Sequence, residues 1–180
     1  MNASKLRTAV VAGATGIIGR AIVAKLAELG EWRTIAVSRS GSTVPGADEA
    51  IAIDLLGSVD VGRKLKSASA AGHLFFAAYL PQPSWIAEVQ PNRALLVNAS
   101  EGLEAVGAPL HHVTLITGAK YYGVHLGISA APALETEPRH LGANFYYTQE
   151  DYLRSRTENS TWQWTNLIST HLTGFALATP

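Results

Sequence analysis

Near its start the chain reads Val10-Val11-Ala12-Gly13-Ala14-Thr15-Gly16-Ile17-Ile18-Gly19, a short apolar segment that runs into three glycines at G-x-x-G-x-x-G spacing. Apolar residues then recur three and four positions apart, which predicts a helix over 17–29. A strand, a glycine turn and a helix in this order form the phosphate site of dinucleotide-binding folds. There Gly13 permits the tight turn, Gly16 lets a pyrophosphate approach the backbone, and Gly19 allows close helix packing. The alternative is an ordinary tight turn between strand and helix.

In such a unit the phosphates lie on unpaired N–H groups at the positive end of the helix. We therefore expect a dinucleotide to contact the residues of this turn, which are Gly13, Thr15, Gly16, Ile17, Ile18 and Gly19.

Short apolar runs alternate with helical patterns along the rest of the chain. We expect strands at 33–37, 49–53, 73–78, 112–117 and 161–168, and helices over 92–106 and 144–157, with a weaker helical pattern at 58–65. Pro91 stands where the first position of the helix over 92–106 would be. This alternation predicts an α/β fold of the Rossmann type in one domain, residues 1–180, with a doubly wound parallel sheet of strand order 3-2-1-4-5-6. The segment 124–141 has two prolines and no clear period, so it is a candidate substrate-side loop.

The amino-acid composition argues against several classes of function. The 180 residues include 47% apolar residues and no cysteine, so a sizeable core is expected while disulfides, thiolate catalysis and Cys-ligated zinc are excluded. The formal net charge is zero, which favours neither nucleic acid nor an anionic membrane as a partner. No signal-peptide pattern and no apolar run of membrane-spanning length is present, so we expect a cytoplasmic protein. The six histidines show no metal-ligand spacing, and no metal site is expected.

The second expected strand ends in Ser38-Arg39-Ser40. An acidic residue at this point binds the ribose hydroxyls of NAD, whereas an arginine accommodates the 2′-phosphate of NADP. NADP is therefore favoured over NAD, and the alternative is a solvent-exposed loop arginine. Asp54 follows the third strand, where it would meet the adenine ring or cap the next helix. The expected cofactor contacts at the strand ends are Ser38, Arg39, Ser40, Asp54, Leu55, Ala77, Ala78 and Thr117.

The candidate catalytic residues do not follow the usual spacing of short-chain dehydrogenases. The usual Tyr-x-x-x-Lys motif of short-chain dehydrogenases is absent, because Glu150 follows Tyr146 and Asp151 follows Tyr147 at that spacing. Lys120 ends the fifth strand, and the carboxyl ends of parallel strands converge on the ligand crevice. Lys120 and the start of the tyrosine helix can therefore meet there. A cation near a phenol favours the phenolate or strengthens its hydrogen bond to a developing oxyanion.

At these residues the chain resembles a known family. Thr117-Gly118-Ala119-Lys120-Tyr121-Tyr122-Gly123 looks like the T-G-x-K-H-Y-x-G motif of the progesterone 5β-reductase/iridoid synthase-like enzymes, atypical members of the short-chain dehydrogenase superfamily. Pro138-Arg139 and the run Asn144–Asp151 resemble that family's P-R followed by N-F-Y-Y-x-x-E-D. The resemblance implies NADPH-dependent reduction of the C=C bond of a small α,β-unsaturated carbonyl compound, with hydride delivered to the β-carbon. It gives Lys120 the lysine role and Tyr146 the tyrosine role as catalytic and cofactor-binding residues, with Tyr147 as the alternative.

The sequence also departs from the family pattern. Tyr121 stands where the family has His, and Ile168-Ser169 stand where it has Arg-Pro. The chain stops at Pro180, about halfway through a typical member, so the resemblance implies that most of the substrate domain is missing. We therefore expect the isolated chain to bind cofactor weakly and to turn over slowly, and its unfinished sheet edge favours association into a homo-oligomer.

Two other functions share the glycine motif. A sugar-nucleotide epimerase or dehydratase of the extended short-chain class has it, but also needs the Tyr-x-x-x-Lys that this chain lacks. A non-catalytic NADP-binding protein needs only the cofactor site, and tight NADPH binding without reduction of any enone would identify it.

Overall fold

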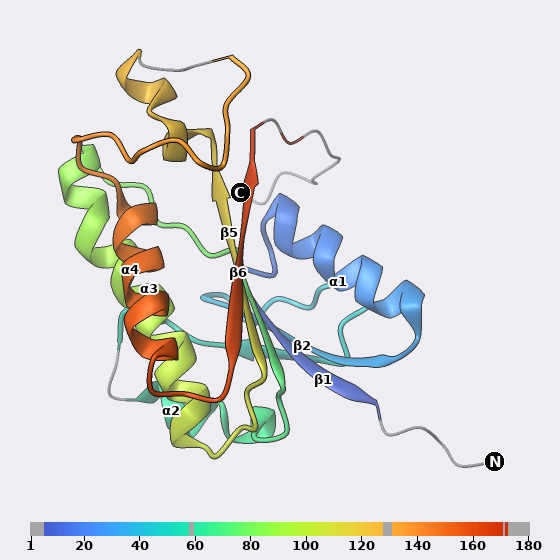
Figure 1. Ribbon diagram of the computed structural model, residues 1–180. Helices are drawn as coiled ribbons and strands as arrows, with labels where there is room; N and C mark the ends of the chain where they lie inside the picture. The colour runs from blue at the N-terminus through green and yellow to red at the C-terminus, as the bar shows by residue number, and fades with distance from the viewer. Residues whose placement is uncertain (1–5, 58–59, 128–130, 171, 173–180) are drawn as a thin grey trace.

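The computed structural model describes residues 6–57, 60–127, 131–170 and 172 of the chain. Six strands form one sheet in the order β3-β2-β1-β4-β5-β6, and every neighbouring pair is parallel (Figure 1). The strands are β1 (Arg7–Ala12), β2 (Trp32–Ser38), β3 (Glu49–Ala52), β4 (His73–Phe76), β5 (His112–Gly118) and β6 (Gln163–Ser169). This confirms the strand order that the sequence predicts.

Helices cover both faces of the sheet. The α-helices are α1 (Ile17–Leu29), α2 (Val61–Lys64), α3 (Trp85–Ala105) and α4 (Phe145–Thr157), and short 3-10 turns follow at η2 (Lys66–Ala68), η3 (Ala119–Tyr122) and η4 (Val124–Leu126). Figure 1 shows α1 alone on one face, with α2, α3 and α4 on the other. Val11, Val23 and Leu26 belong to the buried cluster on the α1 face. Leu96 and Leu153 bring α3 and α4 into the larger cluster on the other face.

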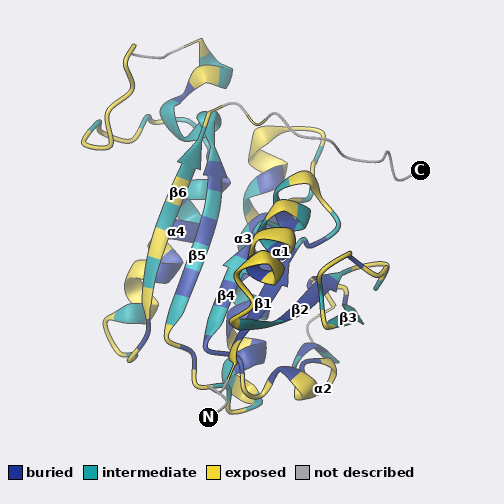
Figure 2. Ribbon diagram, turned by 90° about the vertical axis from the view of Figure 1, so that its right-hand side faces the viewer, coloured by how far each residue is buried: buried dark blue, intermediate teal, exposed yellow. Residues whose placement is uncertain are grey.

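Burial differs across the sheet. The central strands are mostly buried, whereas β6, at the edge of the sheet, alternates between exposed and partly exposed residues (Figure 2). Among the described residues, no helix is both long enough and apolar enough to cross a membrane.

Helix α3 begins earlier than the sequence predicts. Its cap is Ser84, whose side-chain oxygen accepts a hydrogen bond from Ala87 N at 3.3 Å. Pro91 therefore lies inside the helix rather than at its first position, which corrects that expectation. A proline removes one backbone donor from the ladder, so Ala87 O has no i+4 partner. The next side chain, Asn92, donates from Nδ2 to Glu88 O at 2.9 Å. A serine cap outweighs the preference of proline for the first turn.

Two other boundaries differ from the expectation. Strand β4 ends at Phe76, so Ala77 and Ala78 belong to the loop beyond it. Asp54 accepts a hydrogen bond from Leu56 N at 3.0 Å and so closes a local turn, whereas α2 starts later, at Val61. Of the segment expected to be weakly helical, 58–59 lies outside the described residues.

The register aligns the strand ends that build a ligand site. Ala12, the last residue of β1, pairs with Val37 on β2 and with Phe76 on β4. The chain order reverses between β1 and β4, and ligands of open α/β sheets bind in the crevice outside the carboxyl ends at such a switch point. The glycine turn follows β1 at that crevice.

Candidate cofactor and catalytic site

The first and third glycines of the turn are required by the fold itself. Gly13 has φ +80°, and a Cβ atom there would lie 2.7 Å from the Ala77 backbone. A Cβ at Gly19 would lie 2.2 Å from Gly13 O, so only glycine lets α1 lie this close to the turn. These two residues therefore fix the shape of the turn.

Gly16 is different, because the fold has room for a side chain there. A Cβ at Gly16 would lie 3.4 Å from Gly13 O, close to ordinary van der Waals contact. Gly16 is the N-cap of α1 and makes no side-chain cap hydrogen bond, so the first N–H groups of the helix keep their capacity for an outside acceptor. A bare backbone at a helix N-terminus fits the diphosphate of a dinucleotide.

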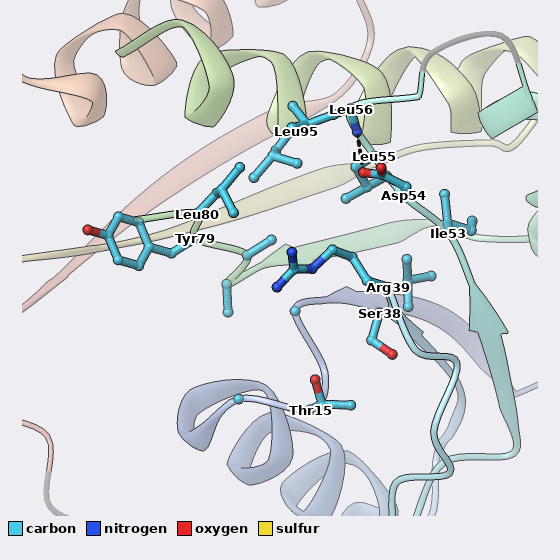
Figure 3. Close-up of a pocket in the computed structure, with 15 residues that line it drawn as sticks. Thr15, Ser38, Arg39, Ile53, Asp54, Leu55, Leu56, Tyr79, Leu80 and Leu95 are labelled. Carbon is cyan, nitrogen blue, oxygen red and sulfur yellow. Dashed lines mark hydrogen bonds between the residues drawn. The ribbon is translucent and has the colours of Figure 1, made fainter. Parts of the chain in front are cut away.

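A cavity of about 390 Å³ opens on this turn. The residues that line it come from the glycine turn, the ends of β2 and β3, the loop after β4, and α3 through Leu95 (Figure 3). Of the residues expected to bind the cofactor, it contains Gly13, Thr15, Gly16, Ser38, Arg39, Asp54, Leu55, Ala77 and Ala78. Ile17, Gly19 and Ser40 do not line it.

Among the residues that line this cavity, Arg39 is the one with a positively charged side chain. Figure 3 shows its guanidinium group extending from the end of β2 into the space between Thr15 and Leu80. Among the described residues Arg39 takes part in no ion pair. The preceding residue, Ser38, accepts a hydrogen bond from Gly41 N at 3.0 Å through its Oγ. Ser40 bonds instead to Ser42, with 2.8 Å between the hydroxyl oxygens.

A second cavity, of about 240 Å³, shares Ala77, Ala78 and Tyr79 with the first. It lies at the ends of β5 and β6 and reaches the first turn of α4. Three further residues expected at the cofactor or the reaction centre line it, namely Ile18, Thr117 and Tyr146. The two cavities therefore form neighbouring compartments with a common wall.

The two candidate tyrosines have different surroundings. The Tyr146 hydroxyl lies 3.3 Å from the position that a Cβ of Gly118 would take, so the absence of a side chain there leaves room for it. Burial raises the pKa of Tyr146, and the charge of Glu88 raises it further. Tyr147 lines neither cavity, and its hydroxyl donates to Tyr121 O at 2.5 Å and accepts from His140 N at 3.3 Å. Its position fits a structural role.

One side chain joins the segments that carry Lys120 and Tyr146. Asn144 is the N-cap of α4, and its Oδ1 accepts from Tyr146 N at 3.0 Å. Its Nδ2 donates to Lys120 O at 2.8 Å. Asn144 is 7% exposed, so both bonds are shielded from water. The amide therefore sets the position of one backbone relative to the other.

The Lys120 ammonium has a partner that the sequence does not reveal. Its Nζ lies 3.2 Å from Glu88 Oε2 and 3.5 Å from the Tyr79 hydroxyl, and Lys120 lines neither cavity. The Tyr79 hydroxyl donates to the same carboxylate. Lys120 is thus held on the α3 side of the site by Glu88, rather than directly on the phenol of Tyr146 as the sequence suggests.

A second buried carboxylate fastens the segment after β5 to α4. Glu150 is 3% exposed and accepts from the Tyr121 hydroxyl at 2.6 Å. It also pairs with Arg139 at 3.0 Å and with Arg154 at 2.5 Å. Burial raises the pKa of Glu150, but the hydrogen bond from Tyr121 and the bonds from Arg154 and Arg139 outweigh it, so the pKa is lowered. The loop that carries Arg139 is thereby anchored beside the tyrosine helix.

Sequence reasoning missed Glu88 and Tyr79, and gave Asn144 no role. The signal for Asn144 was available, since asparagine directly before a helical pattern is a strong N-cap. Glu88 lies before the helix expected over 92–106, so no helical pattern pointed to its burial. Among the described residues, no group of three His, Asp or Glu side chains forms a metal site.

Known proteins share sequence and fold with this chain. A family model described as a PRISE-like Rossmann-fold domain matches residues 52–179. A short chain dehydrogenase from Penicillium aethiopicum is 34% identical over 169 residues, covering 88% of this chain and 45% of its own length. An (S)-8-oxocitronellyl enol synthase from Nepeta racemosa is 30% identical, and a 3-oxo-Delta(4,5)-steroid 5-beta-reductase from Arabidopsis thaliana is 29% identical. Each of these two covers 86% of this chain, which spans 44% of the relative.

Solved structures show the same fold at lower identity. A UDP-glucose 4-epimerase matches with a TM-score of 0.76 and 15% identity, over 97% of this chain and 54% of the epimerase. The UDP-glucose 4-epimerase from Thermus thermophilus, solved with NAD, matches with a TM-score of 0.66 and 21% identity, over 88% of this chain and 53% of that one. The chain therefore spans about half the length of the proteins it matches. The matched residues 52–179 include the motifs that contain Lys120 and Tyr146, and the chain belongs to the PRISE-like Rossmann-fold domain family.

Proposed function

We propose that this chain carries the cofactor half of an NADPH-dependent reductase that acts on the C=C bond of α,β-unsaturated carbonyl compounds. One observation supports this most strongly: the Tyr146 phenol lines a cavity that shares a wall with the cavity on the glycine turn. A hydrogen-bond donor next to a dinucleotide site is the arrangement that such a reduction needs. The names of the related enol synthase and steroid 5-beta-reductase support the substrate class.

Different residues of this chain would bind the cofactor and stabilise the charge that develops on the substrate. The bare backbone at Gly16 and the first N–H groups of α1 hold the diphosphate. When bound, NADPH supplies a hydride for the β-carbon of the substrate, and the electrons of the C=C bond move onto the carbonyl oxygen as an enolate. The neutral phenol of Tyr146 donates a hydrogen bond to that oxygen and stabilises the developing charge. The enolate then takes one proton from water, either on the α-carbon, which gives the saturated carbonyl compound, or on the oxygen, which gives the enol.

NADPH rather than NADH is the proposed cofactor because of Arg39. Its guanidinium group points into the larger cavity, where an anionic 2′-phosphate would be its partner. Removing a charge-assisted hydrogen bond of this kind weakens binding by about 2 kcal/mol, roughly 30-fold. We expect Arg39→Gln to raise the Kd of NADPH by about that factor and to leave the Kd of NADH nearly unchanged, as measured by titration calorimetry. Equal losses for both cofactors would contradict this assignment.

The reductase itself is tested with Tyr146→Phe, and Tyr147→Phe serves as the matched control from the next position. We expect enone-dependent loss of NADPH absorbance to fall about 100-fold in Tyr146→Phe, since that variant lacks the oxyanion donor. Tyr147→Phe should retain most of its turnover, after allowance for any loss of stability. Tight NADPH binding with no oxidation by any enone of a panel would overturn the reductase and identify a non-catalytic NADP-binding protein.

A further inference from the structure

Gly118 ends β5 at the wall of the smaller cavity, and its backbone conformation does not require glycine. Its φ is −144° and its ψ is −176°, an extended conformation that any residue adopts. Glycine at such a position costs stability, because it loses more conformational freedom on folding than alanine does. The proposed function gives Gly118 no role, so the missing side chain there calls for a different reason.

The atoms around Gly118 supply that reason. Apart from its chain neighbours, the described residues place only two atoms within 4 Å of the position that a Cβ would take. These are the Tyr146 hydroxyl oxygen at 3.3 Å and Ser169 O, on the paired residue of β6, at 3.5 Å. The contact with Ser169 O is ordinary, whereas a Cβ would force the hydroxyl back by a few tenths of an ångström. The phenol therefore uses space that a side chain would fill.

The rest of Tyr146 is held by other contacts. Asn144 accepts from Tyr146 N at 3.0 Å and donates to Lys120 O at 2.8 Å, so the start of α4 is fixed to the segment after β5. The Tyr146 ring packs against Phe145, with 4.2 Å between ring centroids. With the helix fixed in this way, the residue at position 118 limits how closely the phenol can approach the end of β5.

Two other hydroxyls of this wall already have acceptors within the protein. Thr117 Oγ1 donates to Asn166 Oδ1 at 2.7 Å, and Ser169 Oγ donates to Thr117 O at 3.1 Å. Thr117 and Ser169 line the smaller cavity together with Tyr146. Because their protons are engaged, the position of the Tyr146 hydroxyl decides how well a substrate oxygen is bound here.

We propose that Gly118 is a positioning residue for Tyr146: the bare Cα at the end of β5 lets the phenol hydroxyl lie at the place in the smaller cavity from which it donates to substrate oxygen. The inference rests on the proposed function and adds the residue that sets the distance between the donor and the strand ends. A methyl group at position 118 would move the hydroxyl, and a misplaced donor stabilises the developing oxyanion less well.

A cycle of melting temperatures tests the contact without cofactor or substrate. In Tyr146→Phe the hydroxyl is gone, so adding Gly118→Ala should raise the melting temperature by about 2 °C, the ordinary gain of alanine over glycine. In the parent protein the same substitution should give no gain or a loss, because the new methyl group meets the hydroxyl. Gly62→Ala in α2 is the matched control, since its Cβ would lie 3.6 Å from Ala105 Cβ. Its effect should be the same in both backgrounds.

A cycle of rates tests the positioning role. A misplacement of about 1 Å costs roughly 100-fold in rate, so we expect Gly118→Ala to lower kcat about tenfold for the enone that the parent protein reduces fastest. The Kd of NADPH should change less than about twofold, because Gly118 does not line the larger cavity. In Tyr146→Phe, Gly118→Ala should cause no further loss, since the donor that it displaces is absent. A general disturbance of the site would lower the rate by the same factor in both backgrounds.

The two cycles separate this proposal from the proposed function. If Gly118→Ala raises the melting temperature equally in both backgrounds, or keeps the turnover of the parent protein, Gly118 does not position the phenol. If the melting temperatures couple as expected but no enone is reduced, the contact stands and the proposed reaction is wrong. If Gly118→Ala does not fold, Gly118→Ala/Tyr146→Phe decides: a folded double variant supports the contact, and an unfolded one shows that the strand end itself requires glycine.

Discussion

At the scale of single residues, the site depends on side chains that connect elements far apart in the sequence. Asn144 caps α4 through its carbonyl oxygen and holds the backbone of Lys120 through its amide nitrogen. The Asn144 oxygen caps the helix and the nitrogen holds the Lys120 backbone, and two substitutions can distinguish these roles.

We expect Asn144→Ala to lower the free energy of unfolding by about 1–2 kcal/mol and to reduce enone turnover, since both bonds are lost. Asn144→Asp keeps the cap acceptor and adds a charge that favours the N-terminus of a helix, so stability should be largely retained. Turnover should still fall, because Lys120 O loses its donor. Thermal unfolding and NADPH oxidation rates check both variants. An Asp variant with the turnover of the parent protein would show that the bond to Lys120 is irrelevant.

Position along the helix also separates Tyr146 from Tyr147. Neighbouring residues of an α-helix differ by about 100° in direction, so only one of two consecutive tyrosines can face the cavity. The sequence left this choice open because both follow the cap at similar spacing. The direction of α4 relative to β5 decides it, and that direction depends on tertiary packing.

At the scale of elements, the glycine turn and α1 combine a requirement of the fold with a requirement of binding. Gly13 and Gly19 lie against backbone atoms of the protein, whereas Gly16 faces outward. Within 4 Å, a methyl group at Gly16 would meet only Gly13 O, at 3.4 Å, so the protein itself leaves room for it.

We therefore expect Gly16→Ala to raise the Kd of NADPH at least about tenfold while lowering the free energy of unfolding by only about 0.5–1 kcal/mol, the loss of a favourable N-cap residue. Gly57→Ala is the control, because its Cβ would lie 3.5 Å from Asp54 O in a loop of ordinary backbone conformation. Binding by calorimetry and stability by urea unfolding distinguish the two effects. A Gly16→Ala protein that binds NADPH normally would remove the turn from the cofactor site.

Local patterns predicted most of the fold. The alternation of strands and helices gave the sheet order, because right-handed crossovers leave few arrangements for six parallel strands. The glycine spacing predicted the turn. Of the Ser38-Arg39-Ser40 segment at the end of β2, Ser38 and Arg39 line the larger cavity and Ser40 does not. The start of α3 was wrong because Pro91 suggested a first turn where Ser84 provides the cap. That error hid Glu88, and no local pattern could show that Glu88 would pair with Lys120, which is 32 positions away.

At the scale of the whole molecule, a histidine cluster at the amino ends of the strands couples stability to pH. His73 on β4 packs edge-on against Trp32, with 4.8 Å between ring centroids, and lies near His111. Burial lowers the pKa of His73, and the charges of His111, His112 and Arg7 lower it further. The folded protein therefore favours neutral His73, while the unfolded chain binds a proton near the ordinary pKa of 6.5.

This difference in proton binding sets the direction in which stability changes with pH. Below a pH of about 6.5 the unfolded state binds more protons, so stability falls as pH decreases and is restored as pH rises. We expect the melting temperature to drop on acidification, and to drop less in His73→Leu, which cannot titrate and keeps an apolar contact with Trp32. Scanning calorimetry at several pH values measures this. An identical pH dependence in both proteins would show that His73 is not responsible.

The central claim is that hydride from NADPH reaches the β-carbon of an enone in the cavity lined by Tyr146. Incubating the protein with NADPH deuterated at the transferred position, and locating deuterium in the product by mass spectrometry and NMR, tests this claim even when turnover is slow. We expect one deuterium on the β-carbon, with the yield strongly reduced in Tyr146→Phe. Deuterium on the carbonyl carbon, or a saturated product without deuterium, would contradict it.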